Sequence, residues 1–334
     1  MDANESIATG HLMRCIAIAV ECRKQGAKCI FFLAEDKETV RLSRRGFSYR
    51  VLNTKWNQMD GEIPDMQQLI KEEQLNVLVV DSYQVTLRYL SCLQQKVPVL
   101  YVDDFGKTVY PVDMVLHYIP ASGDDGYAKM YQGTKTCLLQ GMQYAPLRQE
   151  FAEDDIQVER KKSILITTGG TDSYNVTGKL LAYCEEQPEF VPYTFDVIVG
   201  TMNRNEVYLQ DMAQKNPRIQ LHKNVTNMSD YMRRCEMAVS AGGTTLLELC
   251  ACRIPTVCFS FADNQVDFAK LMQRQNIMLY AGDARIDDRI EQKIAEQLCL
   301  FMQNDKMRTV YADRMGKLVD GKGTARITEC LMEN

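Results

Sequence analysis

A glycine–histidine pair near the start of the sequence has the residue types that acid–base chemistry needs. Gly10 and His11 precede apolar residues spaced three and four apart, a pattern that predicts an amphipathic helix ending at Gly26. The N-terminal end of a helix carries unpaired N–H groups and a partial positive charge, which disfavours a second proton on an imidazole. A neutral His11 at this position can act as a general base, although a capping histidine in an ordinary turn shows the same pattern.

Four polar residues follow two apolar runs of strand length in the first half of the chain. Asp81 and Tyr83 follow one run, and Asp103 and Asp104 follow the next. In an open α/β sheet the ligand crevice lies beyond the carboxyl ends of the strands. These residues are therefore candidates for a binding site, with loop solvation and helix capping as the alternative. Further oxygen ligands for a divalent metal are not recognisable, so we expect no metal.

A glycine turn in the second half is the strongest physical signal. A strand predicted at 237–240 leads into the segment AGGTTLLE at 241–248. Gly242 and Gly243 let a phosphate approach the backbone, the N–H groups of Thr244 and Thr245 point at it, and Glu248 lies within reach of sugar hydroxyls. No lysine follows the glycines, so this is not a Walker A loop. A tight strand–helix turn with a solvated glutamate is the alternative.

Two more polar segments of the second half follow predicted strands. The strand at 163–168 leads into Gly169 and Gly170, and the strand at 255–259 leads toward Asn264 and Gln265. The amide groups of Asn264 and Gln265 are uncharged donors and acceptors, suited to a sugar or a base edge. A ligand site at the carboxyl edge of a second sheet follows from this pattern.

Alternating strands and helices are predicted to position these candidate site residues. In both halves apolar runs alternate with helical patterns, as in parallel sheets buried on both faces. The charged, weakly patterned segment 148–162 separates the halves. We predict an α/β fold of two Rossmann-like lobes facing across a ligand cleft. The lobe at 1–147 would carry His11, and the lobe at 148–334 would bind the nucleotide.

Composition narrows the function further. The chain of 334 residues is long enough for two cores, and its net charge of −5 gives no general electrostatic case for nucleic acid, although a local basic patch stays open. No apolar run approaches the roughly 20 residues that span a bilayer, and the start lacks a signal peptide's features. We therefore expect a cytoplasmic protein with no membrane partner. The scattered cysteines, including Cys29, Cys137 and Cys258 in apolar surroundings, suit reduced thiols.

The motifs, taken in order, resemble a known family. The layout is similar to the two-lobed glycosyltransferases of the type that makes lipid II from a UDP-sugar, and this implies a GT-B-like fold. More specifically, the chain resembles the UDP-sugar hydrolase of pseudaminic acid biosynthesis over almost its whole length. The similar motifs are TGHLMRC (9–15), DSY (81–83), DD (103–104), GMQYAPLRQEF (141–151), TTGGTD (167–172), AGGTTLLE (241–248) and DNQ (263–265).

The resemblance implies hydrolysis of UDP-2,4-diacetamido-2,4,6-trideoxy-β-L-altropyranose to UDP and the free sugar, without a cofactor or metal. His11 would be the general base that activates water for attack at the anomeric carbon. UDP leaves readily once helix N–H groups stabilise its charge, so one base and a positioned water suffice. The implied substrate-binding residues are Gly10, Arg14, Tyr83, Asp104, Asn264 and Gln265, and the implied nucleotide-binding residues are Gly170, Gly242, Gly243, Thr244, Thr245 and Glu248.

The start of the sequence departs from that family. Ala8 stands where the family normally has glycine, and residues 1–6 lack the strand character expected ahead of the first glycine turn. A lobe without its central strand would expose two sheet edges. We therefore expect the first strand of the first lobe to be missing.

Two other functions stay open. A glycosyltransferase would use the same nucleotide site but pass the sugar to a glycan or lipid acceptor, and no basic amphipathic helix supports a membrane-bound acceptor. A sugar-nucleotide-binding protein without catalysis is the third interpretation. UDP release without an acceptor, release that needs an acceptor, and binding without turnover distinguish the three. The motifs specify no oligomeric state.

Overall fold

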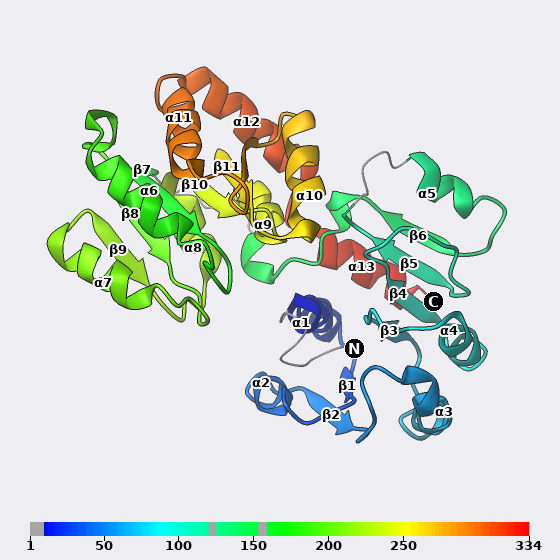
Figure 1. Cartoon of the computed structure of the whole chain (residues 1–334). Helices are drawn as coiled ribbons and strands as arrows, with labels where there is room; N and C mark the ends of the chain where they lie inside the picture. The colour runs from blue at the N-terminus through cyan, green and yellow to red at the C-terminus, as the bar shows by residue number, and fades with distance from the viewer. Residues whose placement is uncertain (1–9, 120–124, 153–158, 334) are drawn as a thin grey trace. The chain divides into compact units, whose positions relative to one another are not determined.

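The computed structural model describes residues 10–119, 125–152 and 159–333. The chain divides into two units, one of Met1–Gln149 with Gly321–Asn334 and the other of Glu150–Asp320 (Figure 1). The chain therefore returns to the first unit for its last helix, whereas the second lobe predicted from sequence contained all of 148–334. The segment 1–6, expected to lack a strand, lies outside the described residues.

Parallel strands form the centre of the first unit. One sheet pairs β1 with β2, and a second sheet has the order β3-β4-β5-β6. Every residue of β4 and β5 is buried, as expected for strands covered on both faces. The strands are β1 (Ile30–Leu33), β2 (Ser48–Val51), β3 (Leu78–Val80), β4 (Val99–Val102), β5 (Met114–His117) and β6 (Cys137–Gln140).

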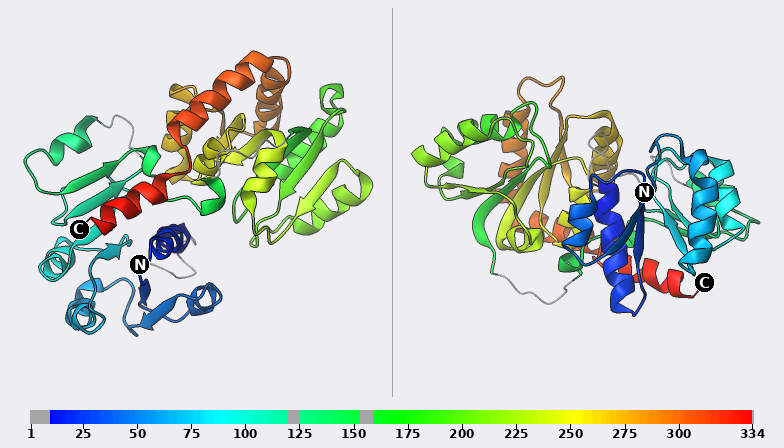
Figure 2. Two further views of the ribbon diagram at one scale, coloured as in Figure 1. Left: turned by 180° about the vertical axis from the view of Figure 1, so that it is seen from behind. Right: turned by 90° about the horizontal axis from the view of Figure 1, so that it is seen from below.

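Helices cover both faces of these sheets. Pro64 lies in the first turn of α3, and the Thr86 hydroxyl caps α4 by accepting the N–H of Tyr89 at 2.9 Å. Helices α1 and α13 lie side by side although they come from opposite ends of the chain (Figures 1 and 2). The helices are α1 (Gly10–Lys24), α2 (Thr39–Ser43), η1 (Met59–Glu62), α3 (Ile63–Glu72), α4 (Leu87–Gln94), α5 (Asp125–Met130), η2 (Met142–Tyr144) and α13 (Gly323–Met332), with η3 (Gln149–Phe151) at the passage between units.

The second unit is built on one parallel sheet with the order β12-β11-β10-β7-β8-β9. The chain starts at β7 in the middle, adds β8 and β9 on one side, and then adds β10, β11 and β12 on the other. This is the doubly wound arrangement, with its switch point between β7 and β10. The strands are β7 (Lys161–Thr167), β8 (Thr194–Ile198), β9 (Ile219–His222), β10 (Cys235–Ala241), β11 (Thr256–Ser260) and β12 (Leu279–Asp283).

A continuous apolar core lies on the inner faces of this sheet and its helices. Ile164, Val239, Val257 and Phe259 are fully buried in it. The Asn304 side chain caps α12 by accepting the N–H of Met307 at 2.9 Å. The helices are α6 (Val176–Glu185), η4 (Pro188–Phe190), α7 (Glu206–Lys215), α8 (Met228–Arg234), α9 (Thr245–Ala251), α10 (Asp263–Arg274), α11 (Ile290–Met302) and α12 (Asp305–Leu318).

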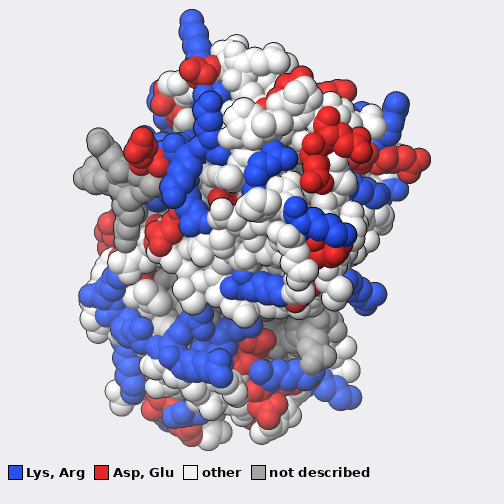
Figure 3. All heavy atoms as spheres, turned by 90° about the vertical axis from the view of Figure 1, so that its left-hand side faces the viewer, with Lys and Arg blue, Asp and Glu red and all other residues white. Residues whose placement is uncertain are grey.

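The surface and the cysteines bear on the expectations from composition. On the face shown in Figure 3, lysine and arginine side chains gather in places, with aspartate and glutamate side chains among them. Within the part of the chain that the structure describes, no helix has the length and apolarity to cross a membrane. None of the twelve cysteines, all within the described residues, forms a disulfide bond. Cys258 is buried as expected, whereas Cys137 is exposed because it lies on the outermost strand β6.

Candidate functional site

Helix α1 brings two polar side chains to the carboxyl end of β3. His11 and Arg14 are three residues apart, so they lie on the same face of the helix. Their exposed fractions are 5% and 9%, and Asp81, the residue that follows β3, is completely buried beside them. Burial of three ionisable groups at a strand end requires that they pair with one another.

The Asp81 carboxylate holds both α1 side chains. Oδ1 lies 2.5 Å from Nδ1 of His11 and accepts a hydrogen bond from Nη2 of Arg14 at 2.6 Å. Oδ2 accepts a second hydrogen bond from Nε of Arg14, also at 2.6 Å. The guanidinium therefore binds the carboxylate through two parallel bonds, the strongest geometry for such a pair.

The charge of Asp81 determines the tautomer of His11. Burial alone would raise the pKa of Asp81, but the hydrogen bonds from Arg14 and His11 and the positive charge of Arg14 outweigh burial and hold this pKa well below its usual range. An ionised carboxylate only accepts, so we assign the proton to Nδ1 of His11. The 3.1 Å approach of Arg14 Nη2 to Nδ1 is then a contact between two donors. Nε2 is left as the basic nitrogen.

Arg14 links this pair to the next strand end. Its Nη1 and Nη2 each donate to Asp104, both at 2.9 Å, and Nη1 also donates to the Tyr118 hydroxyl at 2.8 Å. Burial opposes its charge, but Tyr118, Asp81 and Asp104 together hold the pKa of Arg14 well above its ordinary value. The guanidinium stays charged and fixes the two carboxylates relative to each other.

An aromatic surface lies next to the buried histidine. The Tyr83 ring meets His11 edge-on with centroids 4.4 Å apart, and it contacts Phe105 at 5.1 Å. Tyr83 and Phe105 keep 44% and 42% of their surface exposed, and the Tyr83 hydroxyl donates to Asp104 at 2.8 Å. Burial and the nearby Asp104 carboxylate raise the pKa of Tyr83, so it remains a neutral donor. Exposed rings with a polar tip suit a sugar that is apolar on one face.

Asp103 has a structural role instead. Its carboxylate accepts the N–H of Phe105 at 2.9 Å and the Tyr127 hydroxyl at 2.6 Å. Its carbonyl oxygen lies 2.7 Å from Nδ1 of His117. These contacts shape the loop that contains Gly106, which has a φ of +62°. Of the adjacent aspartates, only Asp104 belongs to the hydrogen-bonded group of His11, Arg14, Asp81, Asp104 and Tyr118, which we call the His11 cluster.

In the second unit the two glycine turns follow neighbouring strands at the switch point of the sheet. Thr167 of β7 lies opposite Ser240 of β10 in the parallel register, so both strands end at one edge. Gly169 and Gly170 follow β7, and Gly242 and Gly243 follow β10. Ligands of doubly wound sheets bind outside the carboxyl ends of the strands at this point.

The two glycines of the second turn differ in their surroundings. A Cβ on Gly242 would come within 3.0 Å of the Gln265 carbonyl oxygen and 3.3 Å of the Ala269 Cβ, so helix α10 packs directly on this turn. A Cβ on Gly243 would meet nothing within 4 Å. The N–H of Gly243 already donates to the Ala241 carbonyl at 2.9 Å, and Thr244 beyond it is exposed. The open space over Gly243 lets a ligand approach the backbone.

The remaining predicted residues occupy the same edge with different exposure. Gln265 uses its side-chain oxygen to accept the Phe261 N–H at 3.0 Å, so it shapes the turn after β11. Asn264 beside it is exposed, and Glu248 is partly buried on α9. The structure thus brings together Gly242 and Gln265 in the second unit and His11, Arg14, Tyr83 and Asp104 in the first. The backbone of Gly170 instead lies against Gly200 after β8.

Two residues of the His11 cluster, Asp81 and Tyr118, were not assigned to a site from the sequence. Asp81 was noted only as a polar residue at a strand end, and its pairing with His11 spans 70 positions of sequence. Its place directly after a buried strand was the available signal. Tyr118 gave no signal, because a tyrosine after an apolar strand is ordinary core material.

Comparison with known proteins agrees with this architecture. Residues 163–315 match the family model described as the glycosyltransferase family 28 C-terminal domain. The spore coat polysaccharide biosynthesis protein SpsG of Bacillus subtilis (strain 168) is 23% identical over 270 residues, covering 79% of this chain and 78% of that protein.

Solved structures match nearly the whole chain. MurG of Acinetobacter baumannii has a TM-score of 0.67 at 12% identity, covering 97% of this chain and 96% of that one. The fold is GT-B-like. UDP-GlcNAc 2-epimerase from Neisseria meningitidis, bound to UDP-GlcNAc, also has a TM-score of 0.67 at 12% identity and covers 98% of both chains. The predicted fold class is confirmed, whereas hydrolysis and pseudaminic acid biosynthesis stay predictions.

Proposed function

We propose that this chain breaks the bond between the anomeric carbon and the diphosphate of a UDP-sugar, with His11 as the general base for an oxygen nucleophile. The observation that carries this proposal is the buried His11–Asp81 pair at the carboxyl end of β3, 2.5 Å apart, which leaves Nε2 of His11 as the basic nitrogen. The GT-B-like fold and the partly exposed Tyr83 beside the imidazole support it.

The chemistry follows from the charges of the cluster. Nε2 of His11 takes the proton of the nucleophile as the new bond to the anomeric carbon forms, and the Asp81 carboxylate stabilises the resulting imidazolium. Such base assistance is worth roughly 10² to 10⁴ in rate. Arg14 keeps Asp81 ionised and, through Asp104, holds the Tyr83 hydroxyl in place for the sugar.

The second unit would bind the UDP group. Its glycine turns lie at the switch point of the sheet, the usual place for such ligands, and the glycosyltransferase family 28 match covers this unit. We assign the diphosphate to the backbone around Gly243, Thr244 and Thr245, with Gly170 at the neighbouring turn and Glu248 on the ribose. Asn264 would contact the sugar, while Gln265 holds the turn beneath it.

The identity of the nucleophile separates two functions. Transfer to an acceptor hydroxyl is better supported by the comparisons, because the matching family model describes a glycosyltransferase domain and SpsG is named as a polysaccharide biosynthesis protein. Hydrolysis is the second candidate, favoured by the seven motifs that resemble the UDP-sugar hydrolase of pseudaminic acid biosynthesis. Both reactions use the same base and leaving group.

A UDP-release assay distinguishes them. UDP-hexoses, UDP-N-acetylhexosamines and the UDP-diacetamido-trideoxy sugar are each incubated with the protein, with and without a panel of oligosaccharide and lipid-linked sugar acceptors. Release that needs an acceptor identifies a transferase, and release into water alone identifies a hydrolase. Tight binding of UDP without release from any substrate, under either condition, would contradict the proposed reaction.

A further inference from the structure

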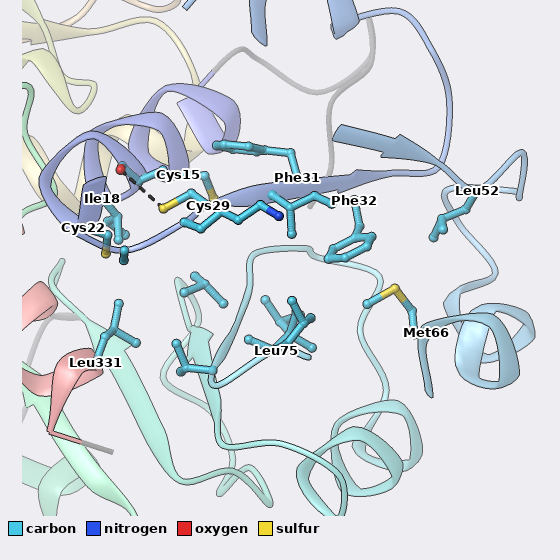
Figure 4. Close-up of a pocket in the computed structure, with 18 of the residues that line it drawn as sticks. Cys15, Ile18, Cys22, Cys29, Phe31, Phe32, Leu52, Met66, Leu75 and Leu331 are labelled. Carbon is cyan, nitrogen blue, oxygen red and sulfur yellow. Dashed lines mark hydrogen bonds between the residues drawn. The ribbon is translucent and has the colours of Figure 1, made fainter. Parts of the chain in front are cut away.

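A large apolar cavity lies in the first unit and reaches the His11 cluster, because Cys15, which lines it, donates to the Asp81 carboxylate at 3.5 Å. Its volume is about 200 Å³, far above the roughly 10–15 Å³ that one water needs. The walls come from α1, β1, β3 and α13, and Figure 4 shows Ile18, Cys22, Phe32, Leu75 and Leu331 around it. The apolar side chains that line it therefore lack packing partners on this side.

Two strand edges flank the cavity. Among the described residues, β1 pairs with β2 alone and β3 pairs with β4 alone, and residues of both strands line the cavity. Asp81 follows the carboxyl end of β3 and contacts the first turn of α1, so that end of β3 lies beside the start of α1. The chain runs away from this point along α1 and comes back toward it along β1. The two strands therefore run in the same direction, each with one unpaired edge toward the space between them.

The apolar core of the first unit is divided at the same place. One cluster joins α1 to β1 and β2 through residues such as Leu12, Ile16 and Leu33. A second cluster joins α3, α4 and β3 to β5 through residues such as Met66 and Val80, and from the other sheet Phe32 of β1 and Leu52 pack against its margin. The cavity is lined from α1 and α13 on one face and from η1, α3 and α4 on the other. An occupant must be apolar on both faces.

The second unit shows what occupies this position in a complete sheet. Its order places β7 between β8 and β10, and the β7 residues Ile164, Leu165 and Ile166 are buried on both faces. β7 then leads to the glycine turn ahead of α6. The first unit has the corresponding order β2-β1, then the cavity, then β3-β4-β5-β6. The cavity therefore takes the position that β7 has in the second unit, and α1 takes the position of α6 after it.

We propose that the cavity is the acceptor site for one further β-strand, supplied by a segment of this chain that precedes Met1. The strand would have about four residues, like β1, and would be apolar on both faces. It would run parallel to β1 and β3 and end at the edge where α1 begins. Pairing to both strands would join them into one sheet and unite the two apolar clusters.

Hydrogen exchange with an engineered N-terminal extension tests this proposal. One variant carries the extension Val-Ile-Val-Ile-Val ahead of Met1, and a matched control carries Val-Pro-Val-Pro-Val, which is apolar but lacks two of the N–H groups that a central strand must donate. We expect the first extension to slow amide exchange in β1 and β3 at least tenfold relative to the unextended chain, and the proline control to leave it unchanged.

Two further measurements apply if the unextended chain folds poorly or self-associates: the yield of soluble protein, and the dependence of amide exchange on protein concentration. If the unextended chain is mostly insoluble, more soluble folded protein with the valine–isoleucine extension than with the proline control supports the proposal, and equal yields contradict it. Equal exchange rates in β1 and β3 for both extensions would overturn it. So would strong protection in the unextended chain that grows with protein concentration, because a second copy would then fill the site. None of these measurements depends on catalysis.

Discussion

Asp81 is the residue on which the first unit's polar cluster depends, because both α1 side chains pair with its carboxylate. Removing one partner from a buried ion pair leaves an uncompensated charge, which typically costs roughly 3–5 kcal/mol. Arg14 also binds Asp104, so it would keep one carboxylate if Asp81 were lost. The function of Asp81 and its contribution to stability are thus linked, and a single substitution changes both.

The Asp81→Asn substitution should lower stability in a pH-dependent way. The native pKa of Asp81 is depressed, so its contribution to the free energy of unfolding is complete above its unfolded pKa, roughly 3.9, and disappears as the pH falls through the lower native pKa. We expect a deficit of about 3 kcal/mol at pH 7 that shrinks below about pH 4. Urea unfolding at pH 7, 5 and 3 measures it.

Two comparisons complete that experiment. Asp103→Asn is the control, because Asp103 is buried but lies outside the His11 cluster. Whatever its effect on the free energy of unfolding, it should leave the His11-dependent rate of UDP release unchanged. A deficit for Asp81→Asn that stays constant from pH 7 to pH 3 would contradict the assignment of an ionised Asp81.

At the scale of secondary-structure elements, the carboxyl edge of the second sheet depends on one close approach. Helix α10 packs against the turn after β10 at Gly242, whereas the neighbouring Gly243 faces open space. Neither glycine has a positive φ. An alanine at Gly242 therefore tests the packing of α10 on the turn, and an alanine at Gly243 tests the approach of a ligand to the backbone.

Alanine substitutions at these two glycines should separate packing from ligand binding. Gly242→Ala should destabilise the protein by about 1–3 kcal/mol, because its Cβ would be forced against the α10 backbone. Gly243→Ala should leave the melting temperature nearly unchanged but weaken UDP binding at least tenfold, because its methyl group would occupy the approach to the backbone. Thermal unfolding and calorimetric titration with UDP measure both effects. Unchanged UDP affinity in a folded Gly243→Ala variant would contradict the assigned phosphate site.

Most strands were predictable from sequence because they are buried on both faces and appear as continuous apolar runs. The apolar run predicted ahead of Asp103 corresponds to β4, and the strand predicted at 163–168 corresponds to β7 within two residues at each end. The strands β6 and β12 were not predicted. Both lie at sheet edges and have a single buried residue each, so they lack the burial on both faces that a continuous apolar run indicates.

The candidate site was predictable only in part. Strand ends and glycine turns indicated which residues reach the carboxyl edges, since that follows from local pattern. The pairing of Asp81 with His11 and the sharing of Arg14 between Asp81 and Asp104 depend on how α1 packs on β3, and no local pattern encodes that packing.

At the scale of the whole molecule, the C-terminal helix belongs to the first unit. In α13 the Thr324 hydroxyl donates to the Leu147 carbonyl at 3.5 Å and Arg326 donates to the Gln143 carbonyl at 2.8 Å. Thr328 contacts Cys22 of α1 at 3.5 Å. The last helix therefore supports the element that carries His11.

Deleting residues 321–334 should destabilise the first unit selectively. Without α13, helix α1 loses its apolar cover at Leu331, so we expect amide exchange in α1 to become at least tenfold faster. Exchange in β7 and β10 of the second unit should change little. A milder variant, Leu331→Ala, should show the same direction with a smaller effect. Equal acceleration in both units, in the deletion and in Leu331→Ala alike, would contradict this division.

The most direct test of the proposed chemistry is the rate of UDP release by His11→Ala, with the most reactive UDP-sugar as substrate. His222→Ala is the matched control, because His222 also lies beside an aspartate, 2.7 Å from Asp196, but in the second unit. We predict a loss of roughly 10²–10⁴ in rate for His11→Ala, with UDP affinity unchanged, and near-normal release for His222→Ala. A His11→Ala protein that binds UDP normally and releases it at the wild-type rate would contradict the role of His11 as the base.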